Sequence, residues 1–302
     1  MRPWLAICLV PVLSLPGLAG PERLTASDLS EGGTVVTGET LAVVDGKEIR
    51  VQDLFPVLFL THTDLMYAAL EQAVQRNLML REVERLDISL DSVKLEENVA
   101  TVLKTQDDEF KLAAGPDFDF EQFIKNRYGT EPAVYRQAVK NQVLEELFLA
   151  RLVRYEARLR EQAVVRMIVL EDLEVAKEIE AKLKDGANFV ALAKAHSIDR
   201  TQSEGGLFPP VARDCPHPLL DGIAALEPGQ VSGISTIERG GRRLYRLLRL
   251  EKLISGDLRP YAEQAQEIEQ ELEQRAIDPF EIMEWDRRVR ERYPIELRLG
   301  RA

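Results

Sequence analysis

The sequence predicts an α+β fold in which a mostly helical body, built from both ends of the chain, is completed around an inserted unit of strands and short helices. Three observations predict it. Apolar residues recur at helical spacing through residues 41–160, runs of β-branched residues and turn signals replace them from Val164, and helical spacing returns after Leu258. Because a terminal helix pair cannot bury its apolar faces alone, we expect it to pack on the N-terminal helices.

Length, charge and composition exclude several classes of protein. The 302 residues suit about two domains. Asp and Glu outnumber Lys and Arg by 51 to 39, and the net charge of −12 argues against nonspecific nucleic-acid binding, which needs a basic surface. Two cysteines and three histidines leave little for a structural zinc site. We therefore expect no metal, no cofactor and no nucleic-acid partner.

Residues 1–20 have the pattern of a secretory signal peptide. Arg2 supplies an early positive charge, an apolar run starts at Trp4, and small residues follow at 17–19. Export would place the mature chain in the periplasm of a Gram-negative cell or on the outer face of a bacterial membrane, where peripheral membrane association stays open. Loss of Arg2 would take the net charge from −12 to about −13. One cysteine, Cys215, would remain.

Two alternatives to a cleaved signal are open. A membrane anchor needs about 20 apolar residues, whereas Pro11 and Pro16 interrupt a shorter run here. A lipoprotein would be modified at Cys8, but Ile7 stands where a small residue is expected, and Cys8 lies early in the run. Both alternatives are therefore less favoured than cleavage near residue 20.

The N-terminal part reads as a leader, a hairpin and a series of helices. Residues 21–40 are polar and aperiodic and predict a mobile leader. Asp45-Gly46 predicts the turn of a short hairpin. The helices expected after it cover residues 51–59, 64–86, 89–105, 120–128 and 132–160.

The middle of the chain alternates strands with short helices before helical spacing resumes. The expected order is a strand at 164–169, helices at 171–184, 188–195 and 219–226, and strands at 231–236 and 242–250. In the final helical region, Asp278 is placed as an N-cap, with Pro279 at the first helical position and Glu281 completing a capping box.

Five arginines between residues 239 and 249 form a basic cluster in an otherwise acidic protein. The two-residue period of a strand puts Arg242 and Arg246 on one face and Arg243 and Arg249 on the other. Two interpretations remain open. The arginines protect an edge strand from pairing with other chains, or they bind an anionic peptide or lipid head group.

Residues 164–250 resemble a parvulin-type (PpiC, rotamase) peptidyl-prolyl isomerase domain. The resemblance rests on the segments VVRMIVL and LEPGQVSGI, on the pair Gly205-Gly206, and on a G-x-x-F-x-x-L-A-x-x-x-S pattern. That pattern is matched by Gly186, Phe189, Leu192, Ala193 and Ser197. With softer motifs, LAVVDGKEI and LRPYAEQAQEIEQELEQ, the chain also resembles SurA-like periplasmic chaperones and their PrsA relatives.

The resemblance implies a four-stranded antiparallel sheet flanked by helices for the inserted unit. It also implies that the N-terminal chaperone domain is completed by the C-terminal helices. The expected parts are a signal peptide at 1–20, the leader at 21–40, a helical domain at 41–160, the parvulin-like domain at 161–253 and the C-terminal helices at 254–302.

The resemblance also implies a site. Members of the family isomerise X-Pro bonds, whose uncatalysed barrier is about 20 kcal/mol, without covalent chemistry. They use two facing histidines, a Cys or Asp beside them, and an apolar proline pocket. Here the histidine positions fall on Met167 and Arg243, and the Asp position is retained at Asp199. Neither Met nor Arg can replace an imidazole pair.

The implied proline pocket falls on Leu207, Cys215 and Leu219. His196 and His217 are the histidines of this region, but neither stands at a family histidine position. We therefore interpret both as incidental surface residues.

Three functions remain open. The first is an exported folding chaperone that binds unfolded or proline-containing segments of secreted or outer-membrane proteins, with weak or lost isomerase activity. The second is an active isomerase that relies on Asp199 and on pocket shape. The third is a dedicated assembly or scaffold subunit for one exported partner. The two missing histidines favour the first or third, and the sequence does not give the oligomeric state.

Overall fold

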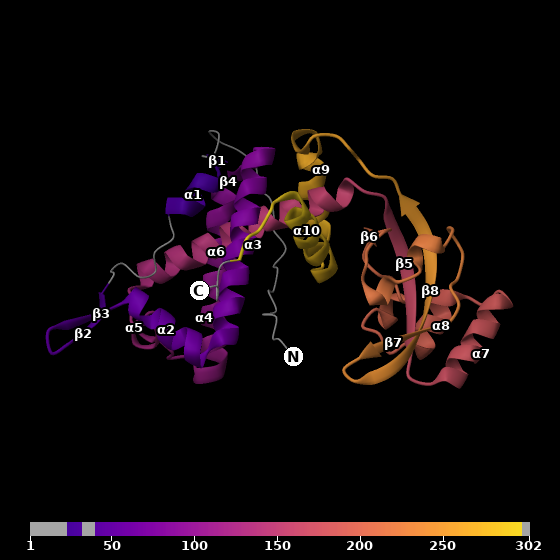
Figure 1. Ribbon diagram of the computed structural model, residues 1–302. Helices are drawn as coiled ribbons and strands as arrows, with labels where there is room; N and C mark the ends of the chain where they lie inside the picture. Colours follow the sequence, from indigo (N-terminus) through magenta and orange to yellow (C-terminus); the bar gives the residue numbers. More distant parts are fainter. Residues whose placement is uncertain (1–22, 32–39, 298–302) are drawn as a thin grey trace. The chain divides into compact units, whose positions relative to one another are not determined.

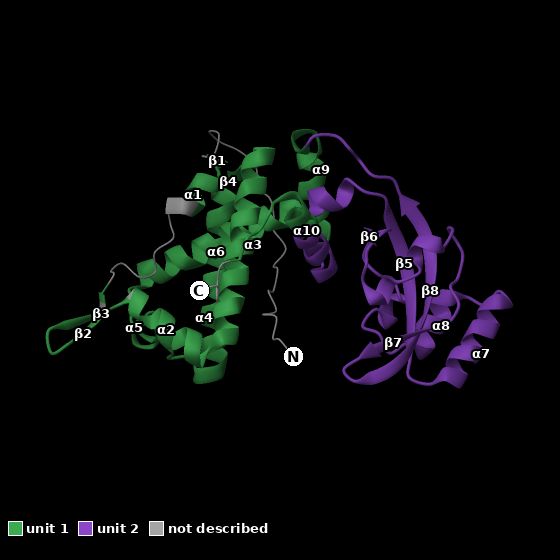
Figure 2. Cartoon of the chain, viewed as in Figure 1, with its two compact units in different colours: residues 1–152, 261–276, 288–302 green, residues 153–260, 277–287 purple. Residues whose placement is uncertain are grey.

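The computed structural model describes residues 23–31 and 40–297. They divide into two compact units (Figures 1 and 2). Unit 1 contains the described residues up to Leu152, Tyr261–Ala276 and the described residues from Arg288. Unit 2 contains Val153–Pro260 and Ile277–Arg287. The predicted signal peptide lies outside the described residues. Across the described ranges, none of the helices combines the length and apolar character needed to cross a membrane.

Unit 1 is a helical body with two small pairs of strands. Its strands are β1 (Arg23–Leu24) with β4 (Leu90–Asp91) and β2 (Thr40–Val44) with β3 (Lys47–Arg50), each pair antiparallel. Its helices are α1 (Ala26–Glu31), α2 (Val51–Thr61), α3 (Thr63–Leu86), α4 (Ser92–Ala114), α5 (Phe120–Tyr128), most of α6 (Pro132–Arg158), α9 (Tyr261–Gln274) and the end of α10 (Pro279–Arg292). The expected hairpin turn at Asp45-Gly46 joins β2 to β3.

The prediction of a mobile leader is wrong for residues 23–31. Leu24 pairs with Leu90 across β1 and β4, and Leu29 on α1 is fully buried. The backbone oxygen of Leu29 also accepts a hydrogen bond from the Arg76 guanidinium, at 3.0 Å. The burial of these two leucines could not be predicted from periodicity. One lies in a two-residue strand and the other in a six-residue helix, and both elements are too short for a periodic pattern.

A buried carboxylate near the C-terminal end of α3 joins this helix to the end of α10. The Glu82 side chain is 1% exposed and forms ion pairs with Arg85 and Arg292, each at 2.6 Å. Its Oε1 accepts a hydrogen bond from the Tyr293 hydroxyl at 2.7 Å. Burial raises the pKa of Glu82, but the hydrogen bonds and the two cations outweigh it, so the net pKa lies below its usual value.

Unit 2 contains one antiparallel sheet with the strand order β6-β5-β8-β7. The strands are β5 (Gln162–Leu170), β6 (Val211–Ala212), β7 (Ser235–Arg239) and β8 (Arg242–Ile254), and the helices are α7 (Leu173–Lys184) and α8 (Phe189–His196). Three 3-10 turns complete the unit, at Gln202–Glu204, Pro218–Leu220 and Ile223–Ala225. The predicted α+β fold class, with its four-stranded antiparallel sheet, is confirmed.

Two expected elements of unit 2 differ from the structure for local reasons. The helix expected over 219–226 is broken into two 3-10 turns by Gly222, whose φ of +88° is left-handed. The strand expected over 231–236 pairs regularly only from Ser235, and Val231 makes one isolated bridge to Arg249.

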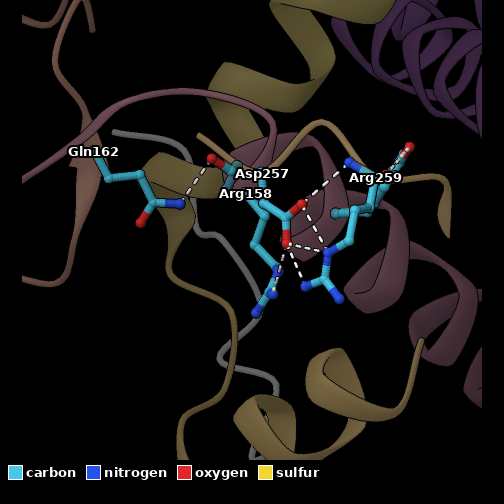
Figure 3. A network of polar contacts seen from close by, with 6 residues as sticks. Arg158, Gln162, Asp257 and Arg259 are labelled. Atoms are coloured by element: carbon cyan, nitrogen blue, oxygen red, sulfur yellow. Dashed lines mark hydrogen bonds and ion pairs between the residues drawn. The ribbon is translucent and has the colours of Figure 1, made fainter. Parts of the chain in front are cut away.

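Polar contacts join the end of α6, which leads into β5, to the segment that follows β8 (Figure 3). The Asp257 carboxylate pairs with Arg259 at 2.5 Å and with Arg158 at 3.4 Å. The Asp257 amide donates to the Arg158 backbone oxygen at 2.7 Å. Hydrogen bonds from Arg259 lower the pKa of Asp257 strongly. The carboxylate is therefore ionised at neutral pH, which keeps both ion pairs formed.

Candidate functional site

The two faces of the unit 2 sheet carry two separate apolar clusters. Ile168 and Leu247 face α7 and α8, where they pack with Ile179 and Phe189. The opposite face, which we name the Met167 face, is covered by the chain between residues 207 and 226. Its buried members are Ala163, Val165, Met167, Val169, Phe208, Val211, Leu220, Ile223, Leu226, Ile237, Leu244, Leu248 and Leu250.

Met167 lies at the centre of its face, with no exposed surface. Its register partner on β8 is Leu248. Its amide donates to the Gly206 backbone oxygen at 2.8 Å, so the Gly205-Gly206 pair lies directly against β5. A methionine buried in this way contributes apolar contacts and offers a bound peptide no strong hydrogen-bonding group.

The two positions assigned to the family histidines do not face each other. Arg243 is the register partner of Glu238 on β7, and its side chain is exposed. It shares the strand face of Tyr245 and Leu247, which is opposite to the Met167 face. The assignment of the second family histidine position to Arg243 stays a prediction, and the structure puts Met167 and Arg243 on opposite faces of the sheet. Arg246, three residues further along β8, is the buried arginine on the Met167 face.

Arg246 is a buried cation that holds the loop over the Met167 face. It is 3% exposed and lies opposite Val169 on β5 and Ser235 on β7. Its guanidinium donates to the backbone oxygens of Pro218, at 2.7 Å, and of Asp221, at 2.8 Å. Burial lowers the pKa of Arg246. The ordinary pKa of a guanidinium is so high, however, that the group stays charged. Sequence spacing alone cannot distinguish it from the exposed arginines beside it.

The edge-strand interpretation is wrong for the four arginines of β8, whereas Arg239 lies on the edge strand β7. β8 lies between β5 and β7 and has hydrogen-bonded neighbours on both sides. Its arginines make several different local contacts. Arg242 pairs with Glu171 at 3.3 Å, and Arg239 of β7 lies 3.6 Å from Asp199. These contacts divide the cluster into separate surface and buried groups.

Asp199 lies buried in the turn that follows α8, with 7% of its surface exposed. Its Oδ1 accepts hydrogen bonds from the Thr201 amide at 3.0 Å and the Thr201 hydroxyl at 2.8 Å. Its Oδ2 faces Arg239 at 3.6 Å. The same turn leads to Gly206, whose amide donates to the Thr201 oxygen at 2.8 Å. Asp199 therefore fixes the loop that reaches Met167.

The predicted pocket residues are only partly brought together. Cys215 and Leu219 are half-buried and pack against the cluster on the Met167 face. Leu207 is not part of that cluster: it makes an isolated bridge to Arg166, while the next residue, Phe208, is buried within it. In this segment it is therefore Phe208, and not Leu207, that packs in the apolar cluster on the Met167 face.

His217 is a component of the same surface, which corrects its interpretation as an incidental residue. Its Nδ1 accepts a hydrogen bond from the Leu219 amide at 3.1 Å. Its ring meets the ring of Phe280 edge-on, with centroids 4.5 Å apart. The Phe280 ring also contacts the Phe208 ring, with centroids 5.1 Å apart and an interplanar angle of 69°. Phe280 could not be predicted as part of this surface, because it comes from a helix more than 60 residues away in the sequence. His196, by contrast, is exposed on α8.

Burial shifts two ionisable groups of this surface toward their neutral forms. Burial raises the pKa of the Cys215 thiol, which keeps it protonated at neutral pH. Burial lowers the pKa of His217, which keeps the imidazole neutral with Nδ1 free to accept. The surface therefore offers an apolar socket with hydrogen-bond donors and acceptors around it. It has no pair of facing imidazoles among the described residues.

Comparisons with known proteins find a family match that covers part of this surface. Residues 171–252 match the family model of the PPIC-type PPIase domain, the rotamase family. The matched range begins after β5, so it includes Asp199, Cys215 and Arg246 but not Met167. No curated protein matches the chain.

Several solved structures resemble the chain at low identity. PrsA from Bacillus cereus is 20% identical, with a TM-score of 0.30, and the match covers 86% of this chain and 94% of that one. The foldase protein PrsA from Streptococcus pneumoniae is 16% identical, with a TM-score of 0.38 and coverages of 86% and 96%. A Campylobacter jejuni structure described under two SurA-like chaperones, PEB4 and Cj1289, is 18% identical, with a TM-score of 0.29 and coverages of 85% and 99%. TM-scores this low do not establish a shared arrangement of the whole chain. The family model, in contrast, confirms the resemblance of the inserted segment, because residues 171–252 match the PPIC-type PPIase domain.

Proposed function

We propose that this protein is an exported folding chaperone that binds unfolded segments of secreted or outer-membrane proteins. In this proposal its PPIC-type domain serves mainly as a peptide-binding surface and has weak isomerase activity or none. The observation that carries the proposal is an apolar surface on unit 1.

We use the name hairpin–α2 surface for the exposed apolar side chains of β2, α2 and the start of α3, which lie close together along the chain where the hairpin leads into α2 (Figure 1). Eight large hydrophobic side chains between residues 43 and 67 are exposed there, and Leu60 is 80% exposed. They are Val43, Val44, Leu54, Phe55, Val57, Leu60, Leu65 and Tyr67. Soluble monomers rarely expose so many neighbouring apolar side chains unless they bind another chain or a membrane.

Weak isomerase activity is proposed from the contents of the Met167 face. Met167 is fully buried, and the Arg246 guanidinium is engaged by two backbone oxygens. Oδ1 of Asp199 already accepts two hydrogen bonds from Thr201. None of these groups is placed as a facing imidazole pair, so selective stabilisation of the twisted amide rests on the apolar socket alone.

An aggregation assay tests the chaperone role. We expect the protein to suppress aggregation of a urea-unfolded outer-membrane protein, and we expect Leu60→Asp to reduce the suppression. Leu112→Asp is the matched control, because Leu112 is 90% exposed on α4 of the same unit but lies outside the hairpin–α2 surface. Equal effects of the two substitutions, or no suppression by the wild type, would contradict the proposal.

An exchange assay tests the proposed isomerase weakness. We expect little acceleration of cis/trans exchange in an X-Pro tetrapeptide, whose uncatalysed exchange takes tens of seconds at 25 °C. Strong acceleration that is lost in Asp199→Ala would instead establish an active isomerase. Binding to one exported protein without general suppression of aggregation would point to a dedicated assembly subunit.

A further inference from the structure

The first turn of α10 has a fixed conformation that determines where Phe280 points. The Asp278 carboxylate accepts from the Phe280 amide at 2.9 Å, and the Glu281 carboxylate accepts from the Asp278 amide at 2.9 Å. Pro279 stands at the first helical position, where its ring favours the helix. This capping box was predicted from the sequence, and it holds the segment Asp278-Pro279-Phe280-Glu281 rigidly in unit 2.

The Phe280 ring lies on the surface where the proline pocket is expected. It packs against the same apolar cluster as Cys215 and Leu219. Its edge-on contacts with Phe208 and His217 are the arrangement that aromatic rings favour at centroid separations of about 4.5–7 Å.

The acidic residues before and after Phe280 in the sequence both form ion pairs with arginines. Asp278 pairs with Arg200, which follows Asp199 in the loop after α8, at 3.2 Å. Glu281 pairs with Arg154 of α6 at 3.2 Å, and both side chains are at least 96% buried. One helical turn later, Glu284 and Arg287 are close enough to Cys215 to affect its pKa. Phe280 therefore contacts the surface, while the acidic residues on either side of the Pro279-Phe280 pair form ion pairs with Arg200 and with Arg154 of α6.

We propose that residues 278–281 occupy the peptide-binding surface of the PPIC-type domain as an intramolecular ligand. It follows that the surface accepts external peptides of the same chemistry, an acidic residue followed by proline and an aromatic residue. The inference rests on the proposed function, because it takes the surface around Cys215 and Leu219 to be the peptide site. An external peptide must displace Phe280 before it binds.

The decisive experiment compares Phe280→Ala with wild type for binding of a fluorescent peptide that has the sequence of residues 275–286. Emptying the site should strengthen binding by about tenfold if Phe280 is docked in roughly nine of ten molecules. Met283→Ala is the matched control, because Met283 lies on the same helix and is 43% exposed. A peptide carrying Ala at the position of Phe280 should bind neither form tightly.

Alkylation of Cys215, followed by mass spectrometry of the peptide that contains it, gives an independent readout. The half-buried thiol should react faster in Phe280→Ala than in wild type or Met283→Ala. Added peptide should slow the reaction in Phe280→Ala. Equal alkylation rates and equal peptide affinities in wild type and Phe280→Ala would show that Phe280 is a core residue and would overturn the proposal.

A second variant covers the case in which Phe280→Ala does not fold. Asp278→Asn keeps an equally good N-cap but removes the charge that faces Arg200. It should strengthen peptide binding by less than Phe280→Ala does, and unchanged binding would count against the proposal. The chaperone role and the intramolecular-ligand inference can be refuted independently of each other. Peptide binding without suppression of aggregation would refute the chaperone role alone, and suppression without peptide binding would refute this inference alone.

Discussion

Gly206 packs against the backbone of Met167 with no room for a side chain. A Cβ atom added at Gly206 would lie 2.3 Å from the Met167 carbonyl oxygen. The Met167 amide donates to the Gly206 oxygen at 2.8 Å, so the two backbones are held together. Gly206 also has a left-handed φ of +78°. The loop that carries Asp199 can therefore reach the sheet only with glycine at this position.

Gly206→Ala is expected to destabilise unit 2 by about 3 kcal/mol or more, because left-handed strain adds to overpacking against fixed backbone. Urea unfolding measures the loss. Gly186→Ala is the control, because Gly186 has a φ of +87° but nothing within 4 Å of an added Cβ. It should cost about 1 kcal/mol from strain alone. Equal losses in the two variants would contradict the close approach to Met167.

Arg246→Met is expected to loosen the loop over the Met167 face, because Pro218 and Asp221 lose the guanidinium that donates to their oxygens. Amide hydrogen exchange at Leu220, which donates to the His217 oxygen at 2.8 Å, should become faster. Arg246→Lys should not restore protection, since one ammonium cannot reproduce the planar fork. The exposed Arg242→Met should leave the Leu220 amide unchanged.

Glu82→Gln is expected to lower the free energy of unfolding at neutral pH by about 1–3 kcal/mol, through loss of charge-assisted hydrogen bonds. The pKa of Glu82 is lowered in the folded protein, so its contribution is fully present above the unfolded pKa of about 4.3 and is lost as pH falls through the folded pKa. Urea unfolding of the two proteins should therefore converge in acid. A pH-independent difference would contradict the assignment, and the exposed Glu84→Gln is the control.

Acidification is expected to open the His217 turn. Burial lowers the pKa of His217, so the neutral ring stabilises the fold. That stability is present above the unfolded pKa of about 6.5 and declines as pH falls from there toward the folded pKa. Protonation of Nδ1 also ends its hydrogen bond from the Leu219 amide. NMR should show Leu219 amide protection falling over this interval while the exposed His62 and His196 serve as references.

Much of the fold could be predicted from local patterns. The helix over 120–128 and the capping box at Asp278 were predicted correctly, because caps and helical periods are local properties. The partners of Leu24 and Leu29 were not predicted, because burial of two isolated apolar side chains depends on segments far along the chain. The boundaries proposed for the domains stay predictions, although Ile277–Arg287 groups with unit 2 in the structure.

The site was predicted less well because strand register decides it. A shift of three positions along β8 separates Arg243 from Arg246, and an odd shift changes the face of the sheet. The same parity separates Leu207 from Phe208. Cys215 and Leu219, which the family resemblance assigns to the proline pocket, both pack against the cluster on the Met167 face. Phe280 could not be found from sequence, because nothing in its own helix indicates which surface covers it.

The pairing of Glu82 with Arg292 also bears on the order in which the chain assembles. The two residues are separated by 210 positions, and Tyr293 joins them from one position further. A chain that emerges N-terminus first therefore forms α3, with Arg85 beside Glu82, long before Arg292 and Tyr293 exist. All of unit 2 lies between these residues in the sequence. We therefore expect the helical body, although its synthesis starts first, to complete its contacts only after the whole of unit 2 has been made.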